Sequence, residues 1–389
     1  MLQIDYIYEF LYQEIFKDFT LCHLPNGVIS TKKEEISLSD ISIFTQKEHT
    51  DKNIFLYDQE PLVAELSDKY IRFFSNFLGI NILITSEFSA LIDQYVEKNN
   101  LYKMYYFFHG FAALDWYRGY YALNHNKLIV KLYNYDFITF NRIITNDRSY
   151  RIYFVSLLKE QGLLPQGQVS FNVTDNLFDD WQDETSNPDS KLTSDAKQHI
   201  ELHLNGITKL IIDSSEVSGS ASANIPRTID RLDFNNDTLN VDAFWHIVTE
   251  TVFYYDKLHL TEKIFKPIVS KQPFMLLAAP GNLAYLKSYG FKTFDSVIDE
   301  TYDTIQDNDL RTQAVVKQLH WYCNLTPGEK TDIIQQLEPI IDYNFHHFYG
   351  EFRYIITQEL LDNTKAVFQT IGHDDTHINY ENIHHVLTH

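Results

Sequence analysis

The sequence has little of what marks several large classes of protein. It contains only two cysteines, Cys22 and Cys323, so one disulfide is the most it can form. No apolar run approaches the roughly 20 residues that a membrane-spanning helix requires. The first residues, MLQIDYIYEF, lack the basic and then apolar segments of a signal peptide. We therefore expect a cytoplasmic protein without a membrane span.

Glycine, proline and basic residues are also scarce. With 13 Gly and 10 Pro in 389 residues, a fibrous or disordered chain is excluded. The 32 basic and 53 acidic residues give a net charge of −21, which repels phosphate backbones and anionic membranes. Apolar residues make up 44% of the chain and aromatic residues 15%, enough for sizeable cores. The length suggests two domains.

Common cofactor and metal motifs are missing as well. The sequence has no Gly-x-Gly-x-x-Gly, P-loop, His-Glu-x-x-His or Cys-x-x-Cys, which argues against a dehydrogenase, an ATPase and a zinc hydrolase. No Asp-x-Asp ends an apolar strand, and Asp307-Asn308-Asp309 lies in a stretch with helical spacing. His373 and His377 belong to a polar tail. We expect no metal site and no cofactor other than a co-substrate.

What the chain does contain is an alternation of short apolar runs with helical patterns, which is typical of parallel sheets covered by helices. Strands are expected at Ile54–Tyr57, Asn81–Thr85, Tyr102–Phe108, Asp136–Phe140, Gln168–Phe171, Phe244–Val248 and Pro273–Leu277. The stretch 244–303 predicts strand, helix, strand, helix, strand. The polar stretch 174–205 is the best linker candidate, although Phe178 and Trp181 offer anchors.

The predicted fold is therefore α/β, with two Rossmann-like domains facing a central cleft and a helical C-terminal segment. The domains are expected at 1–190, 191–345 and 346–389. Helix N-caps are predicted at Ser86, Asp147 and Thr261, and helix stops at Gly162 and Gly290. Thr326-Pro327-Gly328-Glu329 reads as a capping box.

Polar residues collect where the predicted strands end. In open α/β sheets, ligands bind beyond the carboxyl ends of the strands. The first domain offers Asp58, Glu60, Glu87, His109, Asn141 and Arg142 there. The second offers Ser214, Ser215, Glu250, Thr261, Glu262 and Lys263. A ligand-binding cleft needs such groups in both halves.

The group around Thr261 predicts a nucleotide-diphosphate site. A helix that begins at Thr261 presents free N–H groups to phosphate oxygens, and Lys263 adds a positive charge. Glu262 or Glu250 can accept hydrogen bonds from ribose hydroxyls. The alternative is that Glu262 and Lys263 simply form an exposed first helical turn.

The same stretch resembles a known family. Thr261–Ile268 (TEKIFKPI), then Gln272-Pro273-Phe274 and Gly290–Phe294 (GFKTF), is similar to the donor-side signature of fucosyltransferase-like GT-B glycosyltransferases. Three further segments resemble uncharacterised bacterial and phage relatives: Asp58–Pro61, His109–Phe111 and Phe140–Arg142 with Arg148 and Arg151. The resemblance implies that Glu262 holds the ribose and Lys263 the diphosphate. Lys266-Pro267 departs from the pattern, so the sugar and the nucleobase stay open.

A transferase of this kind needs a base for the acceptor hydroxyl and positive charge for the leaving diphosphate. In GT-B enzymes the base comes from the first domain, where Glu60 is the first candidate and His109 the second. Asp58 and Asp115 follow. Lys263 and Arg142 are the candidate cations, ahead of Arg227 and Arg231.

Three functions remain open. The first is a metal-independent, inverting glycosyltransferase that uses a nucleotide-sugar donor and a saccharide acceptor. The second is a phage DNA-modifying glycosyltransferase that acts on hydroxymethylated pyrimidines, for which Lys257, Lys263, Lys266 and Lys271 would supply positive charge. The third is a non-catalytic binding protein for a nucleotide sugar or glycan. An epimerase ranks lower, because no dinucleotide fingerprint is present. The resemblance places the protein in a bacterial or phage-infected cell.

Overall fold

The computed structural model of the chain describes residues 4–23, 42–44, 51–57, 79–126, 133–141, 143–171, 181–207, 210 and 242–381. These residues form an α/β protein whose sheets are built mainly of parallel strands, as the alternating pattern predicts. The chain divides into two compact units. Unit 1 comprises Met1–Arg118, Lys257–Glu262 and Tyr349–His389, and unit 2 comprises Gly119–Asp256 and Lys263–Phe348.

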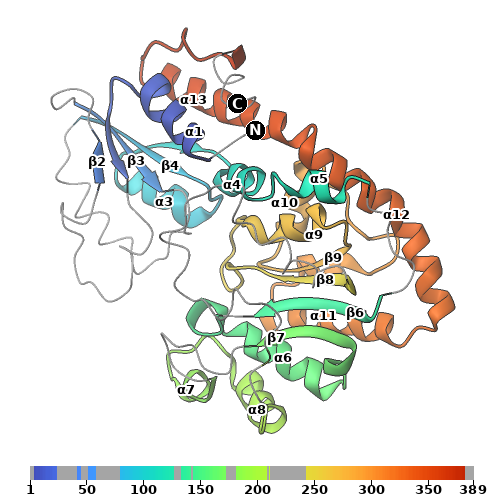
Figure 1. Cartoon of the computed structure of the whole chain (residues 1–389). Helices are drawn as coiled ribbons and strands as arrows, with labels where there is room; N and C mark the ends of the chain where they lie inside the picture. The colour runs from blue at the N-terminus through green and yellow to red at the C-terminus, as the bar shows by residue number, and fades with distance from the viewer. Residues whose placement is uncertain are drawn as a thin grey trace. The chain divides into compact units, whose positions relative to one another are not determined.

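Unit 1 contains a five-stranded sheet in the order β2-β1-β3-β4-β5 (Figure 1). The strands are β1 (Thr20–His23), β2 (Ser42–Phe44), β3 (Lys52–Tyr57), β4 (Ile80–Thr85) and β5 (Tyr102–Tyr105). Strand β2 is antiparallel to β1, and the other neighbours are parallel. Helix α3 (Ala90–Lys98) makes the crossover from β4 to β5 that a parallel pair requires. Its N-cap is Ser89 and not Ser86, because the Ser89 hydroxyl accepts the Ile92 N–H at 3.1 Å.

The core of unit 1 joins the two ends of the chain. Its other helical elements are α1 (Ile4–Glu9), the π-helical turn η1 (Phe10–Ile15), α4 (Phe108–Trp116) and α13 (Phe352–Thr370). Helix α13 packs against β5 and α4, and Asn363 Nδ2 donates to the Tyr105 carbonyl at 3.0 Å. The Phe368 ring lies 5.5 Å from Phe16 and 5.7 Å from Phe19. The C-terminal helix therefore covers the N-terminal sheet (Figure 1).

Unit 2 contains a four-stranded parallel sheet in the order β7-β6-β8-β9 (Figure 1). The strands are β6 (Tyr135–Asn141), β7 (Gly167–Phe171), β8 (Ala243–Thr249) and β9 (Phe274–Leu277). All seven residues of β8 are buried, as expected for a central strand of a parallel sheet that helices cover on both faces.

Helices and short helical turns connect and cover these strands. They are α5 (Tyr120–Asn124), η3 (Asn146–Arg148), α6 (Tyr150–Glu160), η4 (Leu164–Gln166), α7 (Trp181–Ser186), α8 (Ser194–His203), η9 (Glu262–Ile264), α9 (Phe265–Val269), α10 (Asn282–Ser288), η10 (Glu300–Thr304), α11 (Asn308–Cys323) and α12 (Pro327–Tyr349). Helix α6 joins β6 to β7 and packs against α8 and α11. The capping box before α12 is confirmed, since Thr326 N donates to Glu329 Oε2 at 2.8 Å and Glu329 N to Thr326 Oγ1 at 3.4 Å.

Several elements differ from the sequence predictions. The candidate linker carries α7 and α8, and Trp181 is buried. The strand predicted after α10 is absent, since the described residues 291–294 form an irregular segment. Asp147 does not cap α6 but lies in η3 and accepts a hydrogen bond from Tyr255 at 3.0 Å. Within the described residues, β6 pairs with β7 and β8, and none of these three strands joins the sheet of β1–β5. The observed units therefore divide the chain differently from the predicted boundary at residue 190.

Candidate functional site

The carboxyl edge of the unit 2 sheet gathers polar residues, as the strand-end pattern predicts. The register places Thr139 of β6 opposite Ile247 of β8, so Asn141 ends its strand beside Thr249. Asn141 is fully buried and donates to the Ser170 carbonyl at 3.2 Å. Glu250 follows β8 directly, is also fully buried, and donates its N–H to the Leu277 carbonyl at 3.0 Å.

The first turn of α6 fixes this edge from one side. Tyr150 Oη donates to the Glu250 carbonyl at 2.6 Å, and burial raises the pKa of the Tyr150 hydroxyl, which keeps its proton. Arg151 donates to the Thr249 carbonyl at 2.7 Å and to the Ile143 carbonyl at 2.9 Å. Arg151 is thus buried and binds main-chain oxygens.

Lys263 and Glu250, both predicted site residues, are linked through Thr251. Lys263 Nζ donates to Thr251 Oγ1 at 3.2 Å, and the Thr251 N–H donates to Glu250 Oε2 at 3.2 Å. A cation and a carboxylate therefore stand near one another beyond the end of β8. This is the charge pattern that a diphosphate and a ribose hydroxyl would require.

The helix expected at Thr261 is much shorter than the pattern suggested. It consists of the three residues of η9 and the five residues of α9. Pro267 lacks an N–H and α9 ends two residues later, at Val269. So short a helix sums few peptide dipoles, and the predicted anion site at its N-terminus loses its main support. Thr261 itself is 3% exposed.

In unit 1, two residues predicted for different roles lie together. His109, near the start of α4, places Nδ1 3.3 Å from Glu262 Oε2. The His109 side chain is 8% exposed and that of Glu262 is 20% exposed. The imidazole of His259 meets that of His109 edge to face at 5.1 Å. Glu262 is therefore engaged with a histidine, which competes with the ribose role that the family resemblance implies.

A buried ion pair holds the segment 257–262 in unit 1. Lys257 Nζ lies 3.0 Å from Glu87 Oε1, with side-chain exposures of 2% and 1%. Next to it, Phe88 and Leu258 exchange main-chain hydrogen bonds of 3.2 and 2.9 Å. This pair places His259 and Glu262 against α4. Glu87 was recognised as a strand-end residue, but nothing in the sequence indicated that Lys257 is its partner.

Most of the other predicted site residues lie outside the described part of the chain, and Asp115 lies within it. Asp58, Glu60, Arg142 and Ser214 lie outside the described residues, as do Ser215, Arg227 and Arg231. Asp115 is buried and paired with Arg118, whose Nη1 also donates to the Asp115 carbonyl at 2.6 Å. A carboxylate held in this way is a poor general base, because its charge is already compensated.

Sequence reasoning missed a second group in unit 2. A cavity of about 430 Å³ is lined by Tyr153, Leu157, Glu160, Gln161, His199, Gln313, Val316, Lys317 and His320. Beside it, Glu160, His199 and His203 place their polar atoms within 4.8 Å of one another. The His-x-x-x-His spacing of the two histidines was a readable signal, because residues four apart share one face of a helix.

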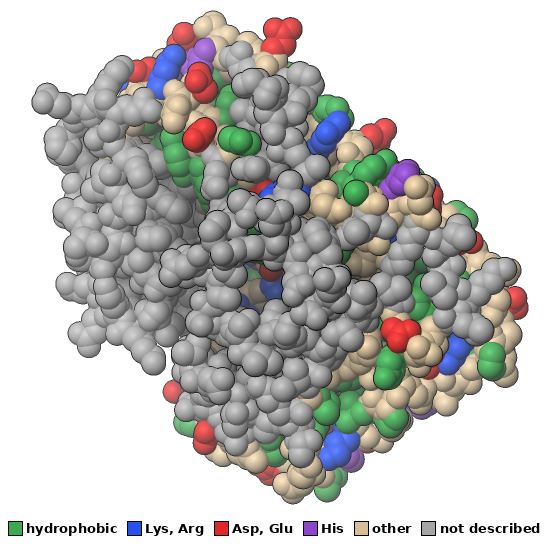
Figure 2. All heavy atoms as spheres, in the orientation of Figure 1, with side chains coloured by type: hydrophobic (Ala, Val, Ile, Leu, Met, Phe, Trp, Pro, Cys, Tyr) green, Lys and Arg blue, Asp and Glu red, His purple; other side chains and the backbone are tan. Residues whose placement is uncertain are grey.

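Comparisons with protein-family models, with curated proteins and with solved structures found no match. None of the helices within the described residues is long and apolar enough to cross a membrane. On the described part of the face in Figure 2, basic and acidic side chains lie interspersed.

Proposed function

We propose that the protein is a nucleotide-sugar-dependent glycosyltransferase of the GT-B type, which transfers a sugar to an acceptor hydroxyl. In this proposal unit 2 binds the donor and unit 1 supplies the general base. The main support is the linked group Glu250, Thr251 and Lys263 beyond the carboxyl end of β8. The Glu-Lys motif at Glu262-Lys263 is the second support.

The roles within the donor site follow from charge. Lys263 offers its ammonium group to the diphosphate, whose negative charge grows as the sugar leaves. Glu250, which is buried in the structure, accepts hydrogen bonds from the ribose hydroxyls in place of Glu262 once donor binding opens its carboxylate to the ligand. The main chain around Glu250 is held by Tyr150 and Arg151, so the adjustment falls on side chains.

His109 is the general base in this proposal. A base needs a partner that fixes its orientation and stabilises the charge it gains, and the Glu262 carboxylate 3.3 Å from Nδ1 can do both. The acceptor would give its proton to Nε2. Glu60 remains the competing candidate and is tested alongside.

Donor binding is tested by thermal shift with a panel of nucleoside diphosphates and nucleotide sugars. A true ligand raises the melting temperature by mass action, corresponding to about 2.7 kcal/mol at a ligand concentration of about 100 times Kd. Lys263→Ala should remove most of that rise, whereas Lys317→Ala, which changes an exposed lysine of the same unit, should not. Equal rises in the two variants would refute the donor site.

Turnover is tested by release of nucleoside diphosphate from the donor found in this way. His109→Asn should lower it by about 10²- to 10⁴-fold with donor binding retained, and the exposed-residue control His125→Asn should not. If Glu60→Ala abolishes release and His109→Asn does not, the base is Glu60. A donor that binds but is never cleaved, with any acceptor, would instead favour a binding protein. A salt-sensitive gel shift with hydroxymethylated DNA would favour the DNA-modifying alternative.

A further inference from the structure

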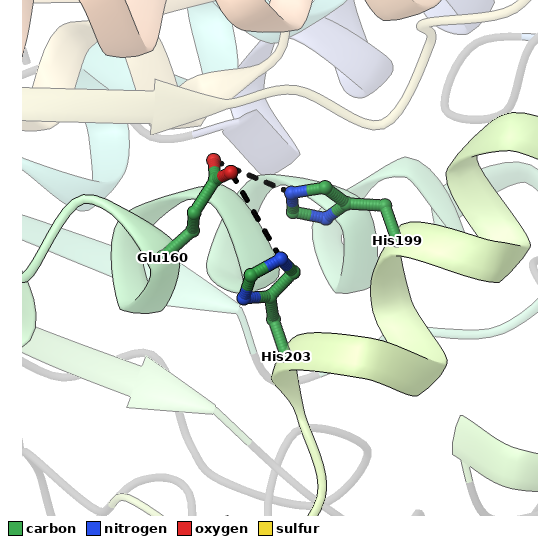
Figure 3. A group of neighbouring side chains, drawn as sticks. All are labelled: Glu160, His199 and His203. Atoms are coloured by element: carbon green, nitrogen blue, oxygen red, sulfur yellow. Dashed lines mark ion pairs between the residues drawn. The ribbon is translucent and has the colours of Figure 1, made fainter.

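Two helices of unit 2 bring three metal-ligating side chains to one point. Glu160 is the last residue of α6, and His199 and His203 are four residues apart on α8. Figure 3 shows the two imidazoles and the carboxylate converging on the space between the helices. His199 Nε2 lies 3.3 Å from Glu160 Oε2, and His203 Nε2 lies 3.9 Å from Glu160 Oε1.

These separations match the edges of a small coordination polyhedron. Bonds of about 2.0–2.2 Å to a tetrahedral zinc ion place neighbouring ligand atoms roughly 3.4 Å apart. The His199–Glu160 contact of 3.3 Å is close to that length, and the His203–Glu160 contact of 3.9 Å is longer by about half an ångström. One ligand atom from each residue lies within 4.8 Å of the other two.

The hydrogen bonds of Ser156 determine which nitrogen of His199 carries a proton. Ser156 Oγ donates its one hydrogen to the Tyr153 carbonyl at 2.7 Å, so towards His199 Nδ1, 3.0 Å away, it can only accept. Nδ1 therefore carries a proton, and in the neutral ring Nε2 presents a lone pair to Glu160. This Nε2 is buried, and the Glu160 carboxylate lies 3.3 Å from it. An imidazole oriented in this way through its other nitrogen is the usual form of a zinc ligand.

We propose that Glu160, His199 and His203 form a zinc site that joins α6 to α8. Two imidazoles and one carboxylate are a common zinc donor set, and three protein ligands leave one coordination position open. Glu160 and His199 also line the cavity of about 430 Å³, so water or a small anion from that cavity fills the fourth position. The ligand side chains are 19–36% exposed, which gives the ion a path from solvent.

The site is separate from the proposed donor site. Glu160 ends the helix whose first turn holds Thr249 and Glu250, and the nine residue steps from Arg151 to Glu160 span roughly 14 Å along the axis. Zinc binding at this point therefore does not depend on the proposed donor site. The zinc ion fastens α8 to α6, the helix against which it packs.

Titration of the chelator-treated full-length chain with zinc chloride, followed by calorimetry, tests the proposal. We expect one zinc ion per chain, and zinc should raise the melting temperature by mass action. His199→Gln and His203→Gln should each weaken binding at least tenfold, while His125→Gln, at an exposed histidine of the same unit, leaves it unchanged. Absence of binding in the wild type, or equal binding in the His199→Gln/His203→Gln double variant, would overturn the proposal and in the second case identify adventitious zinc.

Two further measurements do not depend on the ligand variants folding well. X-ray absorption of the zinc-loaded wild type should show two imidazole nitrogens at about 2.0–2.1 Å. Ser156→Ala removes the acceptor that orients His199 and should weaken zinc binding by about 10- to 100-fold, as loss of an outer hydrogen-bond partner does in other zinc sites. A zinc shell with fewer than two imidazoles, or full affinity in Ser156→Ala, would contradict the arrangement.

Discussion

Single residues in the interior of unit 2 determine how its stability responds to acid. His246 lies in the central strand β8 and is 4% exposed. Burial, and then the charge of Lys266, lowers the pKa of His246 to about 3. The imidazole is therefore neutral in the folded protein at any ordinary pH. In the unfolded chain it can take up a proton, which stabilises the unfolded state as the pH falls.

The first prediction follows from this difference in pKa. Below about pH 6.5 the unfolded state takes up a proton that folded His246 refuses down to about pH 3. His246 should therefore make stability fall with decreasing pH across that window, by up to about 1.4 kcal/mol per pH unit. Urea unfolding of wild type and His246→Gln at several pH values measures it. The variant should show the shallower slope, and parallel slopes would contradict the assignment.

The second prediction concerns the ion pair Lys257–Glu87. Removing one partner leaves a charge buried without compensation, which costs about 3–5 kcal/mol. Lys257→Met should therefore lower the free energy of unfolding by that amount in urea titrations. In the double variant Glu87→Leu/Lys257→Met, much of the loss should be recovered, because apolar residues of similar volume often replace a buried pair without penalty. A single variant as stable as wild type would show that the pair is not needed.

At the scale of residues, the sequence indicated which polar residues follow the strands better than it indicated which residues they contact. The strand-end pattern predicted Glu87, His109 and Glu250 as polar groups for a ligand-binding cleft, and in the structure all three side chains are buried. The contact of His109 with Glu262 joins positions far apart in the chain, and such a pairing depends on tertiary packing that no local pattern carries. The helical spacing of His199 and His203 was local and could have been used.

At the scale of elements, the glycines that end two helices can be compared directly. Gly162 follows α6 with φ +69° and Gly290 follows α10 with φ +89°, so both occupy the left-handed region that favours glycine. Both were predicted as helix stops, and both are confirmed. They differ in surroundings, because a Cβ on Gly290 would lie 2.8 Å from the His347 ring whereas one on Gly162 would meet nothing within 4 Å.

The third prediction uses that difference. Gly162→Ala should cost about 1–2 kcal/mol of stability, the penalty of a left-handed alanine. Gly290→Ala should cost more, because His347 also donates from Nε2 to the Tyr289 carbonyl at 2.7 Å and must shift to admit the methyl group. Thermal unfolding of the two variants gives the comparison. Equal losses would mean that the His347 ring moves without cost.

Strands were more predictable than the connections between them. The apolar runs of β3, β4 and β6 to β9 are visible because buried parallel strands are nearly continuous hydrophobic segments. Helices α7 and α8 were hidden in a polar stretch, since α8 buries only Ala196 and Ile200. Its N-cap Thr193, which accepts the Ala196 N–H at 3.0 Å, was the missed signal.

At the scale of the whole molecule, the net charge should affect the stability of the folded chain. A net charge of −21 produces repulsion that compaction increases. The fourth prediction is that the urea midpoint rises when salt increases from about 10 mM to about 0.5 M, because the Debye length falls from about 30 Å to a few ångströms. Sodium chloride and potassium chloride should act alike. A midpoint that falls with salt would mean that attractive ion pairs outweigh the net repulsion.

The division of the chain into two units was the feature hardest to predict from the sequence. The apolar patterns of β6 and β7 resemble those of β3 and β4. The pattern of a buried strand does not show which sheet the strand joins. Besides β7, β6 pairs with β8, which follows only after about a hundred intervening residues, roughly the size of a small domain. Local patterns describe elements, whereas sheet membership is decided by packing over the full chain.

The fold of unit 1 is complete only when helix α13 has been synthesised. Its strands come early in the chain, but α13, which covers β5, spans Phe352–Thr370. During synthesis the face of β5 that α13 covers should therefore stay open until Phe352–Thr370 has left the ribosome. Nascent chains halted before Phe352 should for this reason be strong clients of chaperones and easy targets for proteases, whereas those released with α13 should escape both.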